Sequence, residues 1–260
     1  MRDAVGEFAD VVSRPEEQID LARAALLLSA ADHPDIEMES YLARIDEMAY
    51  GVADLESLLL RLFTEVGFDG EREHYYEPES SFLDLVIDRR RGNPITLSVL
   101  TIEVGRRAGI KLEGIGMPGH FLVRSPMTGE YVDPFFKGEL MDEEAVEARF
   151  RQVTGLATQV RFGPGMRPVS SKLEILARML NNLKAIYRAR SDGRSLEWVL
   201  RMRLAIPIIP RDEVTDLGQA LALQGRVHEA AAEVLAMADA HPELADQLRA
   251  AARSLRASLN

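Results

Sequence analysis

Two side chains whose types suit acid–base chemistry are His120, at the head of "HFLVR", and Asp133, in "YVDPFF". An imidazole exchanges a proton near neutral pH, and a carboxylate beside it fixes the tautomer and stabilises the imidazolium form. Together they would make the orienting half of a catalytic triad. The same two residue types also form ordinary buried histidine–acid pairs, so both interpretations stay open at this point.

The turn that joins these two segments sets their expected register. If Ser125 to Thr128 form a four-residue turn, Arg124 faces Gly129 across two antiparallel strands. Counting back from that pair places His120 opposite Asp133, on the same face of the sheet. The sequence therefore predicts a hydrogen-bonded cross-strand pair.

A glycine pattern precedes the histidine, because "GIGMPG" satisfies G-x-G-x-x-G from Gly114 to Gly119. A nucleotide-binding loop of this kind needs a helix after it. Pro118 lies inside the pattern, and "HFLVR" that follows has the composition of a strand. We interpret the glycines as turn residues.

Candidate nucleophiles are confined to hydroxyls, because the chain has no cysteine. Asn93 and Pro94 are a helix N-cap and a first helical residue, which puts Thr96 at the third helical position and Ser98 two further on. Either hydroxyl could approach His120 if this helix start docks on the hairpin. A helix N-terminus stabilises an anion by only about 0.3 to 1 kcal/mol, so an alcohol would need a direct hydrogen bond to the histidine.

The periodicity of apolar residues predicts an α+β fold. Helical spacing runs from Pro15 to Arg91 and again after Asn93, and an alternating pattern from Leu112 to Phe136 predicts a small antiparallel sheet. Helical segments then continue from 171 to 257 as short pairs with tight connections, which is typical of a repeat solenoid. We expect a mixed domain at 1–165 and an all-helical domain at 166–260.

Composition excludes several classes of function. The 31 Lys and Arg against 42 Asp and Glu give a net charge of -11, which disfavours nucleic-acid binding and anionic membranes. The acidic N-terminus does not resemble a signal peptide, and no segment has about 18 consecutive apolar residues, so a cytoplasmic protein without a membrane span is expected. The other histidines lack metal-ligand spacing, and neither a metal nor a cofactor is expected; they are His33, His74, His228 and His241.

Three quoted segments, "RGNPITLSVLTIEVGRRAGI", "GHFLVR" and "YVDPFF", resemble the core of the transglutaminase-like superfamily. In that superfamily a helix carrying a cysteine nucleophile precedes a sheet carrying His and then Asp. The longer run that begins at "YYEPESS" resembles the bacterial SirB-type proteins, which join such a core to tetratricopeptide-like helices. Residues at the small and turn positions of a tetratricopeptide repeat follow near the C-terminus: Leu217, Gly218, Ala230 and Pro242.

The sequence departs from this family pattern where the nucleophile should be. The resemblance aligns the G-x-C that begins the nucleophile helix with Gly92-Asn93-Pro94, so a proline replaces the cysteine, whereas His120 and Asp133 match the other two triad members. It implies a catalytically impaired protein that binds a protein or peptide partner as a scaffold. Residues expected at that binding cleft are Asn93, Pro94, Ser98 and Tyr76. The alternative is a hydrolase or acyl transferase with Thr96 or Ser98 as nucleophile, His120 as base and Asp133 as orienting residue.

Overall fold

A computed structural model describes residues 3–155 and 162–257 and confirms the predicted α+β fold. The helices are α1 (Ala4–Val12), α2 (Leu21–Asp32), α3 (Met38–Ala49), α4 (Leu55–Leu59), α5 (Leu83–Arg89), α6 (Pro94–Arg107), α7 (Glu143–Thr154), α8 (Lys172–Ala189), α9 (Gly193–Ala205), α10 (Val214–Leu223), α11 (Val227–Ala240) and α12 (Ala245–Ala257). The short turns of helix are η1 (Glu16–Gln18), the π-helix η2 (Leu60–Val66), η3 (Pro78–Ser81), η4 (Pro134–Phe136), η5 (Pro164–Met166), η6 (Arg211–Glu213) and η7 (Pro242–Leu244). The strands are β1 (Asp69–Gly70), β2 (Arg91–Gly92), β3 (Glu113–Met117), β4 (His120–Arg124), β5 (Tyr131–Asp133), β6 (Glu139–Met141) and β7 (Val169–Ser170).

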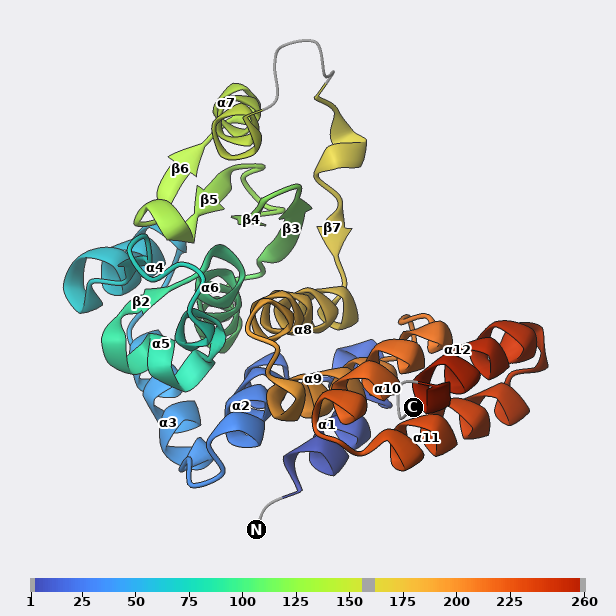
Figure 1. The fold of residues 1–260 in the computed structure, drawn as a ribbon. Helices are drawn as coiled ribbons and strands as arrows, with labels where there is room; N and C mark the ends of the chain where they lie inside the picture. The colour runs from blue at the N-terminus through green and yellow to red at the C-terminus, as the bar shows by residue number, and fades with distance from the viewer. Residues whose placement is uncertain (1–2, 156–161, 258–260) are drawn as a thin grey trace.

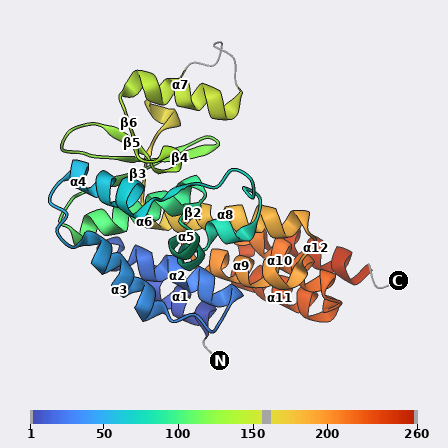
Figure 2. The same ribbon diagram turned by 90° about the vertical axis from the view of Figure 1, so that its left-hand side faces the viewer.

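The main sheet is antiparallel, with strand order β6-β5-β4-β3-β7, and it lies between α7 and the core helices (Figures 1 and 2). Successive side chains of β4 point to opposite faces. Leu122 packs in a small cluster with Val146 and Phe150 of α7, whereas Phe121 belongs to the large core that includes α6 and α8. The sheet is therefore covered on both faces.

The predicted hairpin register is wrong: the four-residue loop begins one residue later than expected, so each residue of β4 faces a position two residues further along β5. Arg124 pairs with Tyr131, and the N–H of Ser125 donates to the carbonyl of Glu130 at 2.9 Å, so the loop is Pro126 to Gly129. Gly129 has φ of 80°, a left-handed conformation that belongs inside the turn and cannot continue the strand. Because the total displacement is two residues, each strand keeps the same faces.

The helix that follows Asn93 begins as predicted. The Asn93 side chain accepts from the N–H of Thr96 at 3.0 Å, and Pro94 is the first helical residue. The two serines that precede α5, Ser80 and Ser81, do not cap that helix. Phe82 stands at the N-cap of α5 without a side-chain bond, because the Ser80 hydroxyl donates to the carbonyl of Glu77 and the Ser81 hydroxyl accepts from Asn93.

The helices α1 and α7 were not predicted, although both carry a local start signal. Asp3 caps α1 and Asp142 caps α7, each accepting an N–H three residues on. α7 presents one narrow apolar stripe on an otherwise polar sequence, and α1 has only nine residues. A short apolar stripe of this kind is a weak helix signal in the sequence, because it is recognised only once the surface on which it packs is known.

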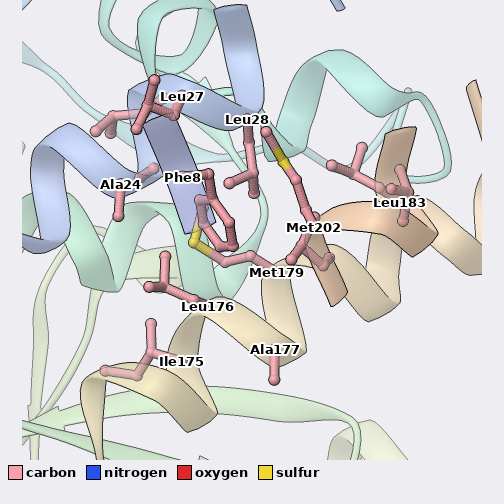
Figure 3. Close-up of a cluster of buried hydrophobic side chains, with 14 of the residues drawn as sticks. Phe8, Ala24, Leu27, Leu28, Ile175, Leu176, Ala177, Met179, Leu183 and Met202 are labelled. Atoms are coloured by element: carbon pink, nitrogen blue, oxygen red, sulfur yellow. The ribbon is translucent and has the colours of Figure 1, made fainter. Parts of the chain in front are cut away.

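The C-terminal helices α8 to α12 each pack against the next, and they share a core with the first helices of the chain. Figure 3 shows Phe8 of α1 and Leu28 of α2 beside Met179 of α8 and Met202 of α9. The predicted boundary at 165/166 remains a prediction; residues 1–2, 156–161 and 258–260 of the two ranges lie outside the described residues. No helix within the described part of the chain is long and apolar enough to cross a bilayer.

Candidate functional site

His120 and Asp133 are in contact at the start of β4 and the end of β5. His120 Nε2 lies 2.8 Å from Asp133 Oδ2, and the two residues are 3% and 0% exposed. They are diagonal neighbours across the ladder, because the true register displaces them by two positions from a direct pair. The contact that the sequence predicts is therefore present, with a different register from the predicted one.

A third member of this group, Arg149 on α7, was not identified from the sequence. Its Nη1 donates to the same Asp133 Oδ2 that contacts the histidine, and its Nη2 donates to Glu139 Oε2 at 2.7 Å. The guanidinium carbon also stands 3.6 Å from the centre of the Phe136 ring. Arg149 is itself 8% exposed, so Asp133 is neutralised by a buried cation.

Aromatic rings and a local turn complete the enclosure of the pair. The imidazole lies 5.9 Å from the Phe135 ring and 6.2 Å from the Phe136 ring. Asp133 Oδ1 accepts from the N–H of Phe135 at 3.1 Å, so the carboxylate also caps the short helix η4. Both oxygens of Asp133 therefore have protein partners.

The two candidate nucleophiles are occupied elsewhere. The Thr96 hydroxyl donates to Asn93 Oδ1 at 3.0 Å, and the Ser98 hydroxyl donates to the carbonyl of Pro94 at 2.8 Å. Both residues are 0% exposed. Among the described residues, neither hydroxyl is hydrogen-bonded to His120.

A cleft of about 520 Å³ opens beside the start of α6. One wall is α8, and the other is the segment from Tyr75 to Ser81. Of the predicted binding residues, Asn93 and Tyr76 line this cleft, and Tyr76 is 79% exposed. Pro94 and Ser98 are buried and do not line it, and neither does His120.

The amide of Asn93 connects the helix start to the cleft wall. Its Nδ2 donates to the Ser81 hydroxyl at 2.9 Å while its oxygen caps α6. Pro94 follows directly, at the position where the family resemblance places a cysteine. The start of α6 therefore carries an asparagine whose amide is hydrogen-bonded through both its nitrogen and its oxygen, followed by a proline, and it has no nucleophilic atom at this position.

A separate charged cluster surrounds His33, which the sequence alone did not distinguish. Its Nδ1 lies 3.5 Å from Asp32 and its Nε2 lies 2.6 Å from the buried carboxylate of Asp84, and these two acids raise the pKa of His33 to about 9. The hydroxyl of Tyr187 on α8 donates to Asp32 at 2.8 Å. The cluster ties α2 and α5 to α8. Over 3–155 and 162–257, no three His, Cys, Asp or Glu side chains are grouped as metal ligands would be.

Comparison with known proteins gives several bacterial relatives. A UPF0162 protein from Xylella fastidiosa strain Temecula1 is 34% identical over 186 residues, which is 66% of each chain. UPF0162 proteins from Vibrio cholerae and Pseudomonas aeruginosa are 31% and 29% identical, over 51% and 66% of this chain and 54% and 66% of their own lengths. The chain thus spans about two thirds or less of the length of these relatives.

A eukaryotic relative is much longer than this chain. F-box only protein 21 from Mus musculus is 26% identical over 234 residues, which cover 85% of this chain and 35% of that protein. The model of the transglutaminase-like superfamily matches residues 27–181, more than half of the chain, and this segment contains α6, the sheet and most of α8. The chain therefore belongs to the transglutaminase-like superfamily.

Proposed function

We propose that this chain is a catalytically impaired transglutaminase-like protein that binds peptide segments of a partner in the cleft between α8 and the Tyr75–Ser81 segment. The observation that carries the proposal is the separation of the open cleft from the acid–base pair. The cleft has about 520 Å³ and a predominantly apolar wall, a volume in the usual range of ligand sites. His120 does not line it and is 3% exposed.

Three contacts weigh against acyl chemistry at this site. The Arg149 guanidinium occupies the Asp133 oxygen that faces the histidine. The Thr96 hydroxyl donates to the side chain of Asn93 and the Ser98 hydroxyl to the carbonyl of Pro94, and both residues have no exposed surface. A hydrolase would need one of those hydroxyls within hydrogen-bond reach of His120 and of a substrate carbonyl. The same pair instead suits a structural role that fixes β4, β5 and α7 together.

Two further features support a binding module. The wall of the cleft on α8 carries the apolar side chains of Ala185, Ile186 and Ala189, against which apolar side chains of a peptide would pack. The relative F-box only protein 21 contains the matching segment in about a third of its length, so the fold occurs as one part of a larger chain. The tetratricopeptide-like character of α8 to α12, which we retain as part of this proposal, would place a second surface beside the cleft.

Selection from a synthetic pool of random heptapeptides, read by mass spectrometry, tests this function. The wild type should retain a subset of peptides, and Ala185→Trp, which fills the exposed cleft wall, should lose them. Ala250→Trp, on an exposed position of α12, is the matched control and should retain the same subset. Equal retention by both variants would place binding outside the cleft.

An assay of amide and ester turnover tests the alternative directly. Purified wild type should show no turnover above that of His120→Ala. Turnover that depends on His120 and on Thr96 or Ser98 would refute the impaired-enzyme part of the proposal. Peptide binding and turnover are read separately, so either part can fail alone.

A further inference from the structure

The hydroxyl of Ser81 is a buried hydrogen-bond donor that lines the cleft. Ser81 is 1% exposed, and its hydroxyl oxygen accepts from Asn93 Nδ2 at 2.9 Å. The proton of that hydroxyl has no acceptor within the described ranges 3–155 and 162–257. A buried donor without an acceptor costs free energy, which a ligand oxygen in the cleft would recover.

The side chain of Asn182 lines the same cleft from the opposite wall. Asn182 is a half-buried residue of α8, and η3, which contains Ser81, contacts α8. The Asn182 amide forms no hydrogen bond with any described residue. An asparagine amide offers one acceptor oxygen and two N–H donors, and the main chain of a peptide offers the complementary C=O and N–H groups. Two side chains with unused hydrogen-bonding groups therefore line one volume.

The remaining residues of the lining leave space for a main chain and no unpaired charge. Arg190 donates to Glu77, so the two charged residues that line the cleft neutralise each other. Ala185 and Ala189 lie on the same face of α8 as Asn182, and their short side chains allow a ligand main chain to approach the helix. A charged ligand group would find no free partner among these residues, so the lining favours an uncharged ligand.

We infer that the cleft binds the main chain of an uncharged, extended peptide segment, with the Asn182 amide bonded to its N–H and C=O groups and the Ser81 hydroxyl donating to a further carbonyl. The inference rests on the proposed peptide-binding function and specifies its ligand. An extended segment fits because its N–H and C=O groups are not used in hydrogen bonds of its own. Its apolar side chains would pack on Ile186 and on the ring of Tyr76.

Substitutions in the peptide main chain test the contact with Asn182. A heptapeptide that the wild type retains from the random pool is resynthesised as a series of analogues, each with one backbone amide replaced by an ester. An ester has nearly the same shape and lacks the N–H donor. Fluorescence polarisation should show that one such replacement weakens binding about threefold to tenfold, as expected for the loss of one hydrogen bond.

A matched pair of variants on α8 locates this contact. In Asn182→Leu the sensitive ester and its parent amide should bind with equal affinity, because the acceptor of the N–H is gone. Asn181→Leu alters an exposed neighbour that does not line the cleft, and it should keep the wild-type difference. Neither asparagine side chain is hydrogen-bonded to a described residue, so neither variant removes an internal contact. Persistence of the difference in Asn182→Leu contradicts the inference.

Ser81→Ala tests the second contact and should weaken binding of the parent peptide about threefold to tenfold. Unchanged affinity would remove Ser81 from the site. This variant also leaves Asn93 Nδ2 without its acceptor, so its fold is checked by circular dichroism. If Ser81→Ala does not fold, Ser81→Cys serves instead, because a thiol fills the position and is a much weaker donor than a hydroxyl.

Three outcomes separate the inference from the function on which it rests. If the wild type binds its heptapeptide equally well with every ester replacement, peptide binding stands and recognition of the main chain is wrong. Enrichment of Asp, Glu, Lys or Arg among the retained heptapeptides would overturn the uncharged ligand in favour of a charged one. If the wild type retains no heptapeptide, the peptide-binding function itself is wrong.

Discussion

Removal of the Arg149 guanidinium should destabilise the protein strongly, because it leaves the Asp133 carboxylate without a cation in a buried site. In Arg149→Met the side chain keeps similar length and loses its charge. The Asp133 side chain is 0% exposed and that of Arg149 is 8% exposed, so the pair is a buried one. Breaking such a pair costs about 3 to 5 kcal/mol. We expect the lower end, about 3 kcal/mol, because His120 and the N–H of Phe135 still bond the carboxylate.

Urea denaturation followed by far-ultraviolet circular dichroism measures this loss of unfolding free energy, and thermal denaturation measures the fall in melting temperature. For a chain of this size the expected fall in melting temperature is roughly 6 to 12 °C, at about 2 to 4 °C per kcal/mol. Arg249→Met is the matched control, because its ion pair with Asp239 joins side chains that are 50% and 75% exposed, and it should change stability by less than about 0.5 kcal/mol. Adding Asp133→Asn to Arg149→Met should recover part of the loss. Similar losses in Arg149→Met and Arg249→Met would refute the buried-pair reasoning.

Three further predictions concern other parts of the molecule. The pKa of His33 is raised to about 9 from 6.5, so its contribution to stability is complete below about pH 6.5 and is lost as the pH rises through about 9. The difference in unfolding free energy between wild type and His33→Gln should therefore shrink from pH 6 to pH 10, and a constant difference would contradict this assignment. Thr96→Val and Ser98→Ala should leave labelling by a fluorophosphonate probe unchanged at background, since both hydroxyls are buried; labelling that either variant abolishes would identify a reactive hydroxyl. Proteolysis between Gly163 and Gly165 should yield two fragments that co-elute in size-exclusion chromatography, because the core joins α1 and α2 to α8 and α9; free separation would contradict the shared core.

Much of the secondary structure follows from short-range signals. The helix at Met38–Ala49 and the helices of the C-terminal region follow from apolar spacing, and the Asn93-Pro94 start of α6 follows from capping chemistry. These signals involve residues that are close together in the sequence, so they can be recognised without knowledge of the tertiary structure. The absence of cysteine is likewise a property of composition and needs no structure.

The register of the hairpin shows where local reasoning stops. The sequence leaves open which four residues of "SPMTGE" form the loop, and the left-handed conformation of Gly129 decides it. The face shared by His120 and Asp133 was nevertheless predictable, because a displacement of two residues preserves the side-chain alternation. The face of the sheet on which a side chain lies is therefore predicted more reliably than the residue that it pairs with on the next strand.

Beyond the predicted contact of His120 with Asp133, the tertiary structure alone determined which groups meet at the site. Arg149 reaches Asp133 from α7, which follows β6, and the walls of the cleft come from segments as far apart as Glu77 and Arg190. Such contacts depend on how an amphipathic helix packs on a surface made elsewhere in the chain, and no motif in either segment encodes its partner. The sequence determined the residue types available for chemistry and the absence of a thiol. Packing decided that the acid–base pair is enclosed under α7 while the accessible volume lies beside α8, because burial is a property of the assembled chain.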